Sequence, residues 1–478
     1  MAKRDRLEEE LRGREPDHVF RATVGSEYEN TLSYVLCKVF LPKTFDGSPF
    51  LILEPTKEQE KGLLGTFEFR IEGKIGDESS CGLNISAKSV YARTRYNKHW
   101  SDDIAESILI CEPQDLEITQ FLSATKPATD GLFGTLVLTP SILLSPSMIY
   151  DHHPNGEIKA QIVRELLFPL DSGPVLKFEK QFSYEFFPGA KRMTENLAAT
   201  FKEQIPLASL PEVISDLDDF LLLVSFADRH RCVCNGWTLG NDQLVTQHYR
   251  RNVVVPPKSE HSVSGTLIDL VHAKEFLTSV YRKFKDTELK DLIRHGFYGT
   301  LGGQDRTMER AILSMFAGLE SLTLFFRKES NFELILAESE WKEFENGIKA
   351  WMKGQSTLKH SAEVRNLVYG KLKELNRPSF SEVFKRFVDK YQINVSDLWP
   401  VTGHGSLLDI RNRIIHGEIF SRAQEWAMST AVQNLHWLLE KILLTILGWP
   451  IEKSRVSPTA LRFMCAYMDW REDKEVFS

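Results

Sequence analysis

The helical half of the chain is organised around the stretch Leu407-Leu408-Asp409-Ile410-Arg411-Asn412-Arg413-Ile414-Ile415-His416-Gly417. At about 100° per residue, its leucines and isoleucines fall on one arc of a helix, whereas Asp409, Asn412 and His416 fall on the opposite arc. Arg411 does not follow this division, because it projects into the apolar arc. Burying an always-charged guanidinium is costly unless a carboxylate meets it. We therefore expect an acidic partner for Arg411 in the helical core.

Glu320 is the partner that the sequence indicates. It lies in the stretch Ala317-Gly318-Leu319-Glu320-Ser321-Leu322 of a long apolar helix, on the same arc as Leu313, Phe316 and Leu324. A glutamate at such a position is rarely buried without a partner. We expect Glu320 and Arg411 to face each other across the core, and the substitution Glu320→Ala to cost roughly 3–5 kcal/mol.

Asn412 and His416, one turn apart, are the outward polar groups of this helix. Histidine can take and give a proton near neutral pH, and arginine offers a fixed cation to a phosphate in which charge builds up. Asn412 can orient a hydroxyl or the imidazole, and Arg413 supplies a second cation, so either arginine could serve the phosphate. These groups suit cleavage of RNA by its own 2′-hydroxyl without a metal ion or other cofactor. One histidine per site predicts that a second chain contributes the other acid or base.

The spacing of arginine, asparagine and histidine here resembles the RNxxxH motif of the HEPN superfamily of helical ribonucleases. The helix that carries Glu320 is similar to the matching helix of the ApeA-like HEPN subgroup, and the resemblance covers roughly residues 264–478. A β-rich half ahead of such a domain is similar to the architecture of ApeA-type abortive-infection proteins, which defend bacteria against phage. For the first half the likeness rests on architecture alone.

The resemblance implies a metal-independent endoribonuclease that leaves a cyclic phosphate, with Arg411 and His416 catalytic and Asn412 supporting them. It also implies a homodimer that joins two motifs, an RNA substrate with transfer RNA as one candidate, and dormancy until a phage product is sensed. Two alternatives stay open. In the first, the β-rich half binds a ligand or partner and the helical half only dimerises. In the second, the β-rich half contains an active site, for example that of a carbohydrate-active enzyme. Such enzymes use a pair of carboxylates, and we can nominate no such pair in this half.

The 478 residues suit two or three domains. We expect a charged leader at 1–16, a β-rich sandwich or barrel-like domain at 17–190, a mixed α/β connecting region at 191–263, and an all-α HEPN bundle at 264–478. The fold class is therefore α+β and multidomain. Residues 181–187 alternate polar and aromatic side chains like the last strand of the β-rich domain, and Pro256-Pro257 marks the boundary before the helices.

The sequence of the helical half predicts eight helices, at Leu267–Lys285, Asp305–Arg327, Glu338–Met352, Ala362–Leu375, Ser379–Tyr391, Leu407–His416, Ser421–Leu447 and Pro458–Trp470. The helix from Ser421 is the clearest, because Gly448 can cap its end and Pro450 forbids continuation. Glu440 and Lys441 lie within it, so it reads as a core helix and not as a membrane anchor.

The net charge of −7 argues against a generally basic nucleic-acid binder, although a local basic cleft stays compatible with it. If the protein binds RNA, we expect phosphate contacts at the basic groups 249–251, 281–285 and 371–373. The mixed-charge N-terminus has no apolar signal segment, which predicts a cytoplasmic protein, and no stretch predicts a membrane span. The histidine and cysteines at 230–234 lack the spacing of paired zinc knuckles, so we expect no metal site.

Overall fold

The computed structural model describes residues 14–25, 32–42, 48–56, 59, 68–76, 82–100, 104–122, 131–152, 158–164, 166–187, 190–251, 265–286, 288–302, 307–355 and 362–477. The chain divides into a β-rich unit, Met1–Ser225 with Arg231–Val255, and a helical unit, Phe226–His230 with Pro256–Ser478. A β-rich half followed by a helical half, as the sequence predicts, is therefore observed. Of the expected leader at 1–16, residues 1–13 lie outside the described part, as does Pro256-Pro257.

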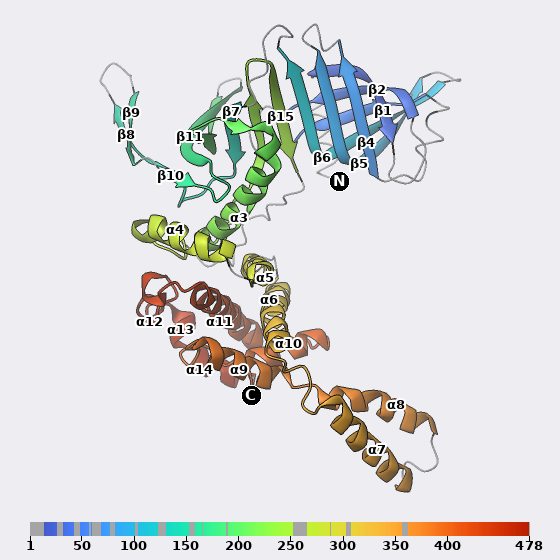
Figure 1. Ribbon diagram of the computed structural model, residues 1–478, viewed down its shortest axis with the longest axis vertical. Helices are drawn as coiled ribbons and strands as arrows, with labels where there is room; N and C mark the ends of the chain where they lie inside the picture. Colours follow the sequence, from blue (N-terminus) through green and yellow to red (C-terminus); the bar gives the residue numbers. More distant parts are fainter. Residues whose placement is uncertain are drawn as a thin grey trace. The chain divides into compact units, whose positions relative to one another are not determined.

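The β-rich unit contains these described strands: β1 (His18–Gly25), β2 (Leu32–Phe40), β3 (Phe50–Glu54), β4 (Glu68–Ile75), β5 (Leu83–Trp100), β6 (Ile104–Phe121), β7 (Gly131–Leu138), β8 (Ser147–His152), β9 (Ile158–Arg164), β10 (Leu166–Pro169), β11 (Val175–Phe187), β12 (Ala190–Phe201), β13 (Ile205–Pro206), β14 (Cys234–Gly240) and β15 (Leu244–Arg250). All but β8 and β9, which pair with each other, belong to one 13-stranded sheet. The strands are labelled where there is room in Figure 1.

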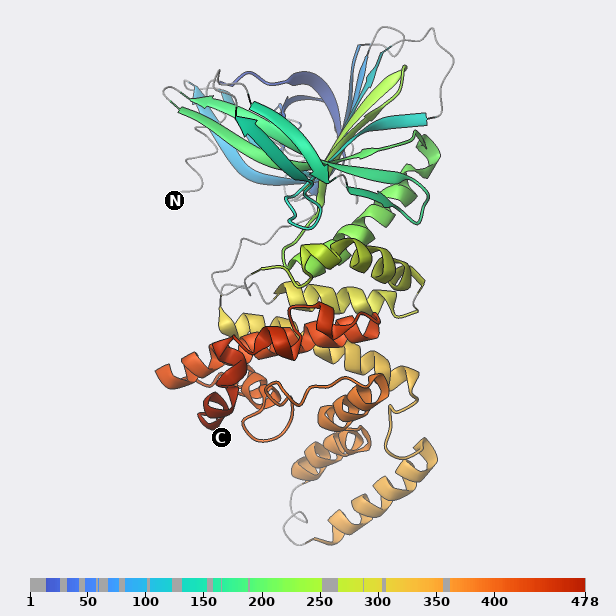
Figure 2. The same cartoon turned by 90° about the vertical axis from the view of Figure 1, so that its left-hand side faces the viewer.

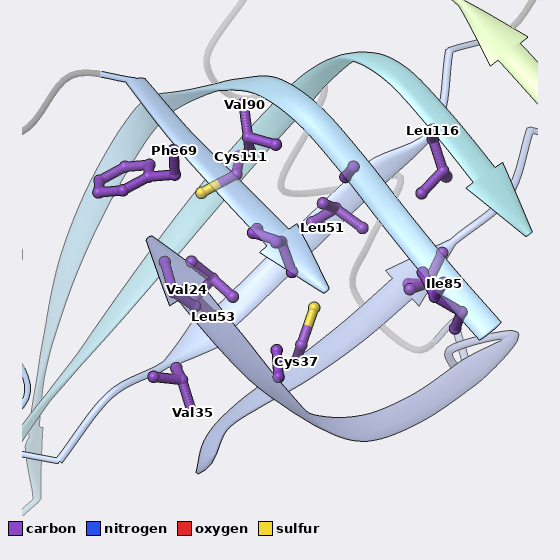
Figure 3. Close-up of a cluster of buried hydrophobic side chains, with 14 of the residues drawn as sticks. Val24, Val35, Cys37, Leu51, Leu53, Phe69, Ile85, Val90, Cys111 and Leu116 are labelled. Atoms are coloured by element: carbon purple, nitrogen blue, oxygen red, sulfur yellow. The ribbon is translucent and has the colours of Figure 1, made fainter. Parts of the chain in front are cut away.

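Part of this sheet closes into a barrel. The series β6-β3-β2-β1-β4-β5 returns to its start because β5 also pairs with β6. Alternate residues point inward: Phe20, Ala22 and Val24 of β1 are buried between exposed neighbours. Figure 3 shows the core that they share with Cys37, Leu51 and other side chains of the surrounding strands. The barrel-like prediction is confirmed for these six strands.

Beyond the barrel, β6 also pairs with β15, and the sheet continues through β14, β7, β12 and β11 to β10. Residues 181–187 are therefore not the last strand, because β11 pairs with β12 and the chain returns later to add β14 and β15. Helix α3 (Leu210–Asp228) begins in this unit, where Phe220 packs against Phe168 and Phe178. Most described residues of the expected connecting region 191–263 thus belong to the sheet or to its helix.

The helical unit contains α4 (Leu270–Asp286), α5 (Lys290–Gly302), α6 (Met308–Glu329), α7 (Glu338–Gly354), α8 (Ala362–Leu372), α9 (Phe380–Tyr391), α10 (Leu407–Ile415), α11 (Arg422–Ile446), α12 (Pro458–Leu461), α13 (Cys465–Met468) and α14 (Trp470–Glu475). Short 3-10 turns are η3 (Leu207–Ser209) in the β-rich unit and η4 (Lys373–Asn376) and η5 (Ile451–Lys453) in the helical unit. No helix in the described part of the chain is long and apolar enough to cross a bilayer.

The helices differ from the predicted set at α5 and at 458–470. The predicted set omits α5, because its glycines lower helix propensity. Those glycines allow close packing, since a Cβ on Gly299 would lie 3.1 Å from the Cα of Gly318 in α6 and a Cβ on Gly296 would lie 2.6 Å from the side chain of Leu443 in α11. The single helix expected at Pro458–Trp470 is broken, because Met464 adopts an extended backbone between α12 and α13.

Helix α11 forms the centre of the helical unit and packs against α5 and α6 (Figure 2). It begins at the capping box of Ser421 and Gln424. Gly448 adopts a φ of 71°, and the N–H of Trp449 donates to the carbonyl of Leu444 at 2.9 Å, which is the Schellman arrangement. The predicted end of this helix at Gly448 is confirmed.

Candidate functional site

The loop ahead of α10 is held by a fully buried asparagine of α11. The Asn434 side chain accepts a hydrogen bond from the N–H of Trp399 at 3.1 Å and donates to two backbone carbonyls at 3.0 and 2.8 Å. The Trp399 indole N–H donates to the carbonyl of Gly405 at 2.9 Å. Ser406 then caps α10 by accepting from the N–H of Asp409 at 3.3 Å. Buried hydrogen bonds therefore fix the position at which α10 begins.

His416 follows the last residue of α10 as its C-cap, and the helix ends one residue earlier than expected. Gly417 has a φ of 73°, its N–H donates to the carbonyl of Ile414 at 3.0 Å, and the N–H of Glu418 donates to the carbonyl of Arg413 at 3.0 Å. This Schellman ending stops the helix and turns the chain away. The His416 side chain is exposed and has no hydrogen-bond partner among the described residues. Its imidazole is therefore available to a ligand.

The predicted pair of Arg411 and Glu320 is confirmed. Arg411 Nη2 donates to Glu320 Oε1 at 2.7 Å. The side chains are 25% and 39% exposed, so the pair lies at the edge of the core and the prediction that it is buried is wrong. The position of a residue around a helix predicts which way its side chain points, but not how deeply it is buried. Here the stripe of α6 that carries Glu320 is itself partly open to solvent. Half-exposed pairs contribute about 0–1 kcal/mol, well below the predicted cost.

Arg411 keeps unused hydrogen-bonding capacity. Its Nη1 donates to Asn412 Oδ1 at 3.1 Å, so Asn412 orients the guanidinium. A guanidinium has five N–H donors, and the contacts with Glu320 and Asn412 use two of them. The remaining donors have no acceptor in the described part of the chain, so they are available to an anion.

Arg413 has a different role from the one that the sequence left open. Its Nη2 donates to the carbonyl of Phe477 at 2.8 Å and to Asp409 at 3.4 Å, and its Nη1 reaches Glu418 at 3.5 Å. Its guanidinium carbon also lies 5.9 Å from the centre of the Phe477 ring. Arg413 therefore joins α10 to the C-terminal segment, which leaves Arg411 as the better-placed cation for a substrate.

Large apolar side chains are exposed around the end of α10. The exposed fractions are 52% for Ile415, 93% for Ile419 and 72% for Trp426. The expectation that Ile415 lies on a buried arc is wrong, because the chain leaves the core at the end of α10. Large apolar groups in water next to a polar motif are typical of a surface that another protein covers.

Glu320 lines a groove with a volume of about 460 Å³. Its walls are one face of α6, which includes Leu324 and Arg327, and the start of α9, which includes Phe380. Sequence reasoning missed Arg327, although it follows Glu320 by seven residues and so lies on the same helical stripe. The groove gives the motif a neighbouring surface that could hold part of a ligand.

The basic groups expected to contact phosphate are partly occupied. Arg250 forms a two-bond ion pair with Asp218 at 2.8 and 2.9 Å, and Arg251 pairs with Glu112. These two arginines of the β-rich unit are therefore neutralised locally.

Within the described ranges, no group of three or more His, Cys, Asp or Glu side chains is arranged to hold a metal ion. Comparison of the chain with protein-family models, with curated proteins and with solved structures gives no match. Glu320, Arg411 and Asn412 form one connected group, Arg413 faces the C-terminal segment, and His416 projects into solvent. These residues are therefore the candidate functional site of the chain.

Proposed function

We propose that this protein is a metal-independent endoribonuclease of the HEPN type that acts as a homodimer. The observation that carries the proposal is the arrangement of Arg411 and His416. Glu320 and Asn412 orient Arg411 at the edge of the core while it retains unused donors, and the exposed His416 lies five residues further on at the helix end. A fixed cation and a titratable base on one short helix suit transfer of a phosphoryl group.

In the proposed reaction, the neutral imidazole of one His416 takes the proton of a ribose 2′-hydroxyl. The 2′ oxygen then forms a bond to the adjacent phosphorus, and the bond from phosphorus to the 5′ oxygen breaks. Arg411 stabilises the negative charge that builds up on the phosphate oxygens. The 5′ oxygen leaves with a proton from the protonated His416 of a second copy. The products are a 2′,3′-cyclic phosphate and a free 5′-hydroxyl.

The second copy is part of the proposal, because each chain supplies one histidine in this motif. The exposed Ile415, Ile419 and Trp426 support it, since covering them would bring the ends of two α10 helices together. We further propose that the β-rich unit keeps the nuclease inactive until it senses a phage product, as in bacterial abortive infection. Only the resemblance to ApeA-type proteins supports this last step.

The rival function is a HEPN protein that only dimerises and binds a partner. One observation favours it: both terminal nitrogens of Arg411 already have acceptors in Glu320 and Asn412. In that case the motif would stabilise the dimer surface, and His416 would have no chemical role. Cleavage chemistry therefore distinguishes the two functions.

The test compares the purified full chain with His416→Ala and with His295→Ala, which removes another exposed histidine on α5. Each is incubated with total RNA in the presence of EDTA, and the 3′ ends of the fragments are analysed for cyclic phosphate. We expect His416→Ala to reduce cleavage by about 10²–10⁴-fold, the usual contribution of general acid–base catalysis, and His295→Ala to cleave like the wild type.

Cleavage that His416→Ala leaves unchanged, or that EDTA abolishes, would overturn the proposed mechanism. The same three proteins are also compared for phage protection in bacterial cells, where any trigger is present. Equal protection by the wild type and His416→Ala would favour the binding protein over the nuclease.

A further inference from the structure

The groove between α6 and α9 contains Arg327, a cation that no carboxylate in the described part of the chain neutralises. Arg327 is half-buried, and its Nε is covered by protein without any hydrogen-bond acceptor in the described part of the chain. No described carboxylate forms an ion pair with it, in contrast to Arg411 on α10 and Arg386 on α9. A buried donor without a partner costs free energy. An anion bound to the terminal nitrogens of this guanidinium would compensate its positive charge.

The same groove offers apolar contact surface. Phe380 and Leu324 line it, and Leu324 is 43% exposed. The Phe380 ring is held in place by a stack on Phe384, with ring centres 5.9 Å apart. Nucleic-acid bases bind to aromatic and apolar side chains of this kind when they are unpaired, irrespective of sequence. The cation and the apolar surface together suit the binding of one phosphate and one base of a nucleic acid.

The groove leads towards the proposed catalytic residues. Arg327 lies seven residues after Glu320 on α6, which corresponds to about two turns or roughly 10 Å along the helix. Glu320 also lines the groove, and Arg411 compensates its negative charge. A ligand that reaches both arginines must therefore be longer than a single phosphate. A polymer with repeating phosphates meets this condition.

We propose that this groove binds the single-stranded RNA substrate next to the scissile phosphate, with Arg327 contacting a flanking phosphate and Phe380 and Leu324 contacting a base. The site rests on the proposed ribonuclease function and assigns to it a substrate-binding surface. Recognition through phosphate and stacking predicts a preference for unpaired over double-stranded RNA, because bases in a duplex are already stacked.

The test measures binding without cleavage, so every protein carries His416→Ala. The probe is a short fluorescein-labelled single-stranded RNA of mixed sequence, and its anisotropy is recorded at several salt concentrations. We expect Arg327→Ala to weaken binding about tenfold and to reduce the slope of log K against log salt by about 0.7, the value for one phosphate contact on a single strand. The matched control is Lys328→Ala, which removes an exposed charge from the next position on α6.

A second variant tests the groove without removing a half-buried arginine. Leu324→Glu introduces a carboxylate into an exposed position three residues from Arg327 and should weaken binding by a similar factor. Equal RNA affinity of Arg327→Ala and Lys328→Ala, or unchanged RNA affinity of Leu324→Glu, would overturn the proposal that the groove binds RNA while leaving the proposed function intact. Failure of the His416→Ala protein itself to bind RNA would overturn both, and tighter binding of a duplex than of the single strand would overturn the proposed recognition.

Discussion

Two of the arginine–glutamate pairs in the helical unit, Arg229 with Glu440 and Arg411 with Glu320, differ in depth. Arg229 donates from Nε and Nη2 to the two carboxylate oxygens of Glu440 at 2.7 and 2.6 Å, and the side chains are 5% and 1% exposed. Arg411 makes one bond of 2.7 Å to Glu320, and these side chains are 25% and 39% exposed. The first pair uses both carboxylate oxygens out of reach of water, whereas the second leaves donors at the surface.

The difference separates an arginine that stabilises the fold from one that can act on a ligand. Arg229 has a φ of 52°, a left-handed conformation that costs free energy in a non-glycine residue. Its two-bond pair with Glu440 of α11 helps to hold it in that conformation directly after α3. Arg411 lies in an ordinary helix, and its bonds to Glu320 and Asn412 orient the guanidinium without enclosing it. Partial exposure is therefore the property that makes Arg411 a candidate for catalysis.

The largest effect in this comparison is expected from Glu440→Ala. Removing this carboxylate leaves the Arg229 guanidinium charged and buried, which typically costs 3–5 kcal/mol. Urea unfolding of the full chain, followed by far-ultraviolet circular dichroism, measures the loss of stability in the helices. Glu440→Gln keeps one acceptor and should cost less. A loss of less than about 1 kcal/mol for Glu440→Ala, the range of exposed pairs, would remove the distinction between the two pairs.

A smaller effect is expected from pH, because His436 lies beside the buried pair. Its Nε2 lies 3.1 Å from the carbonyl of Thr300, which can only accept, so Nε2 carries the proton of the neutral ring. Burial lowers the pKa of His436 and the charge of Arg229 lowers it further, against the opposing effect of Glu440. The unfolded chain takes up this proton below about pH 6.5 while the folded chain does not, so stability falls as the pH drops through that value.

His436→Gln can retain a donor for the Thr300 carbonyl and removes the titration. The fall in urea midpoint between about pH 7.5 and about pH 5.5 should therefore be smaller in this variant than in the wild type. Identical pH dependence in the wild type and His436→Gln would show that His436 is not the group responsible.

The sequence leads to one of these pairs and not to the other for a physical reason. Glu320 and Arg411 each stand out as a charge on an apolar arc of a predicted helix, which is a local signal. Glu440 gives the same signal in α11, but Arg229 lies just after the end of α3, 211 positions earlier, where no helical arc marks it. The pairing of β14 and β15 with strands distant in sequence cannot be predicted for the same reason. Alternation of polar and apolar residues within a strand does not identify the strand that pairs with it. The sequence likewise does not reveal how deeply a charged side chain is buried, as the half-exposed Glu320 shows.

The smallest change in stability, but a clear loss of activity, is expected from Glu320→Ala. The pair is more than one-third exposed on its carboxylate side, so its loss should cost less than about 1 kcal/mol. RNA cleavage should nevertheless fall by about tenfold or more, because Arg411 would no longer be oriented towards the phosphate. Glu320→Gln keeps an acceptor and should retain more activity than Glu320→Ala.

The matched control is Glu382→Ala, which breaks the exposed pair with Arg386 at 3.2 Å on α9. It should alter stability as little as Glu320→Ala does and leave cleavage unchanged, since neither side chain reaches the motif in the described contacts. A loss of 3 kcal/mol or more for Glu320→Ala, of the order expected for a buried pair, would make Glu320 and Arg411 a second structural pair. Unchanged cleavage would remove Glu320 from the site, because a half-exposed pair that neither stabilises the fold nor orients Arg411 has no role in the proposed reaction.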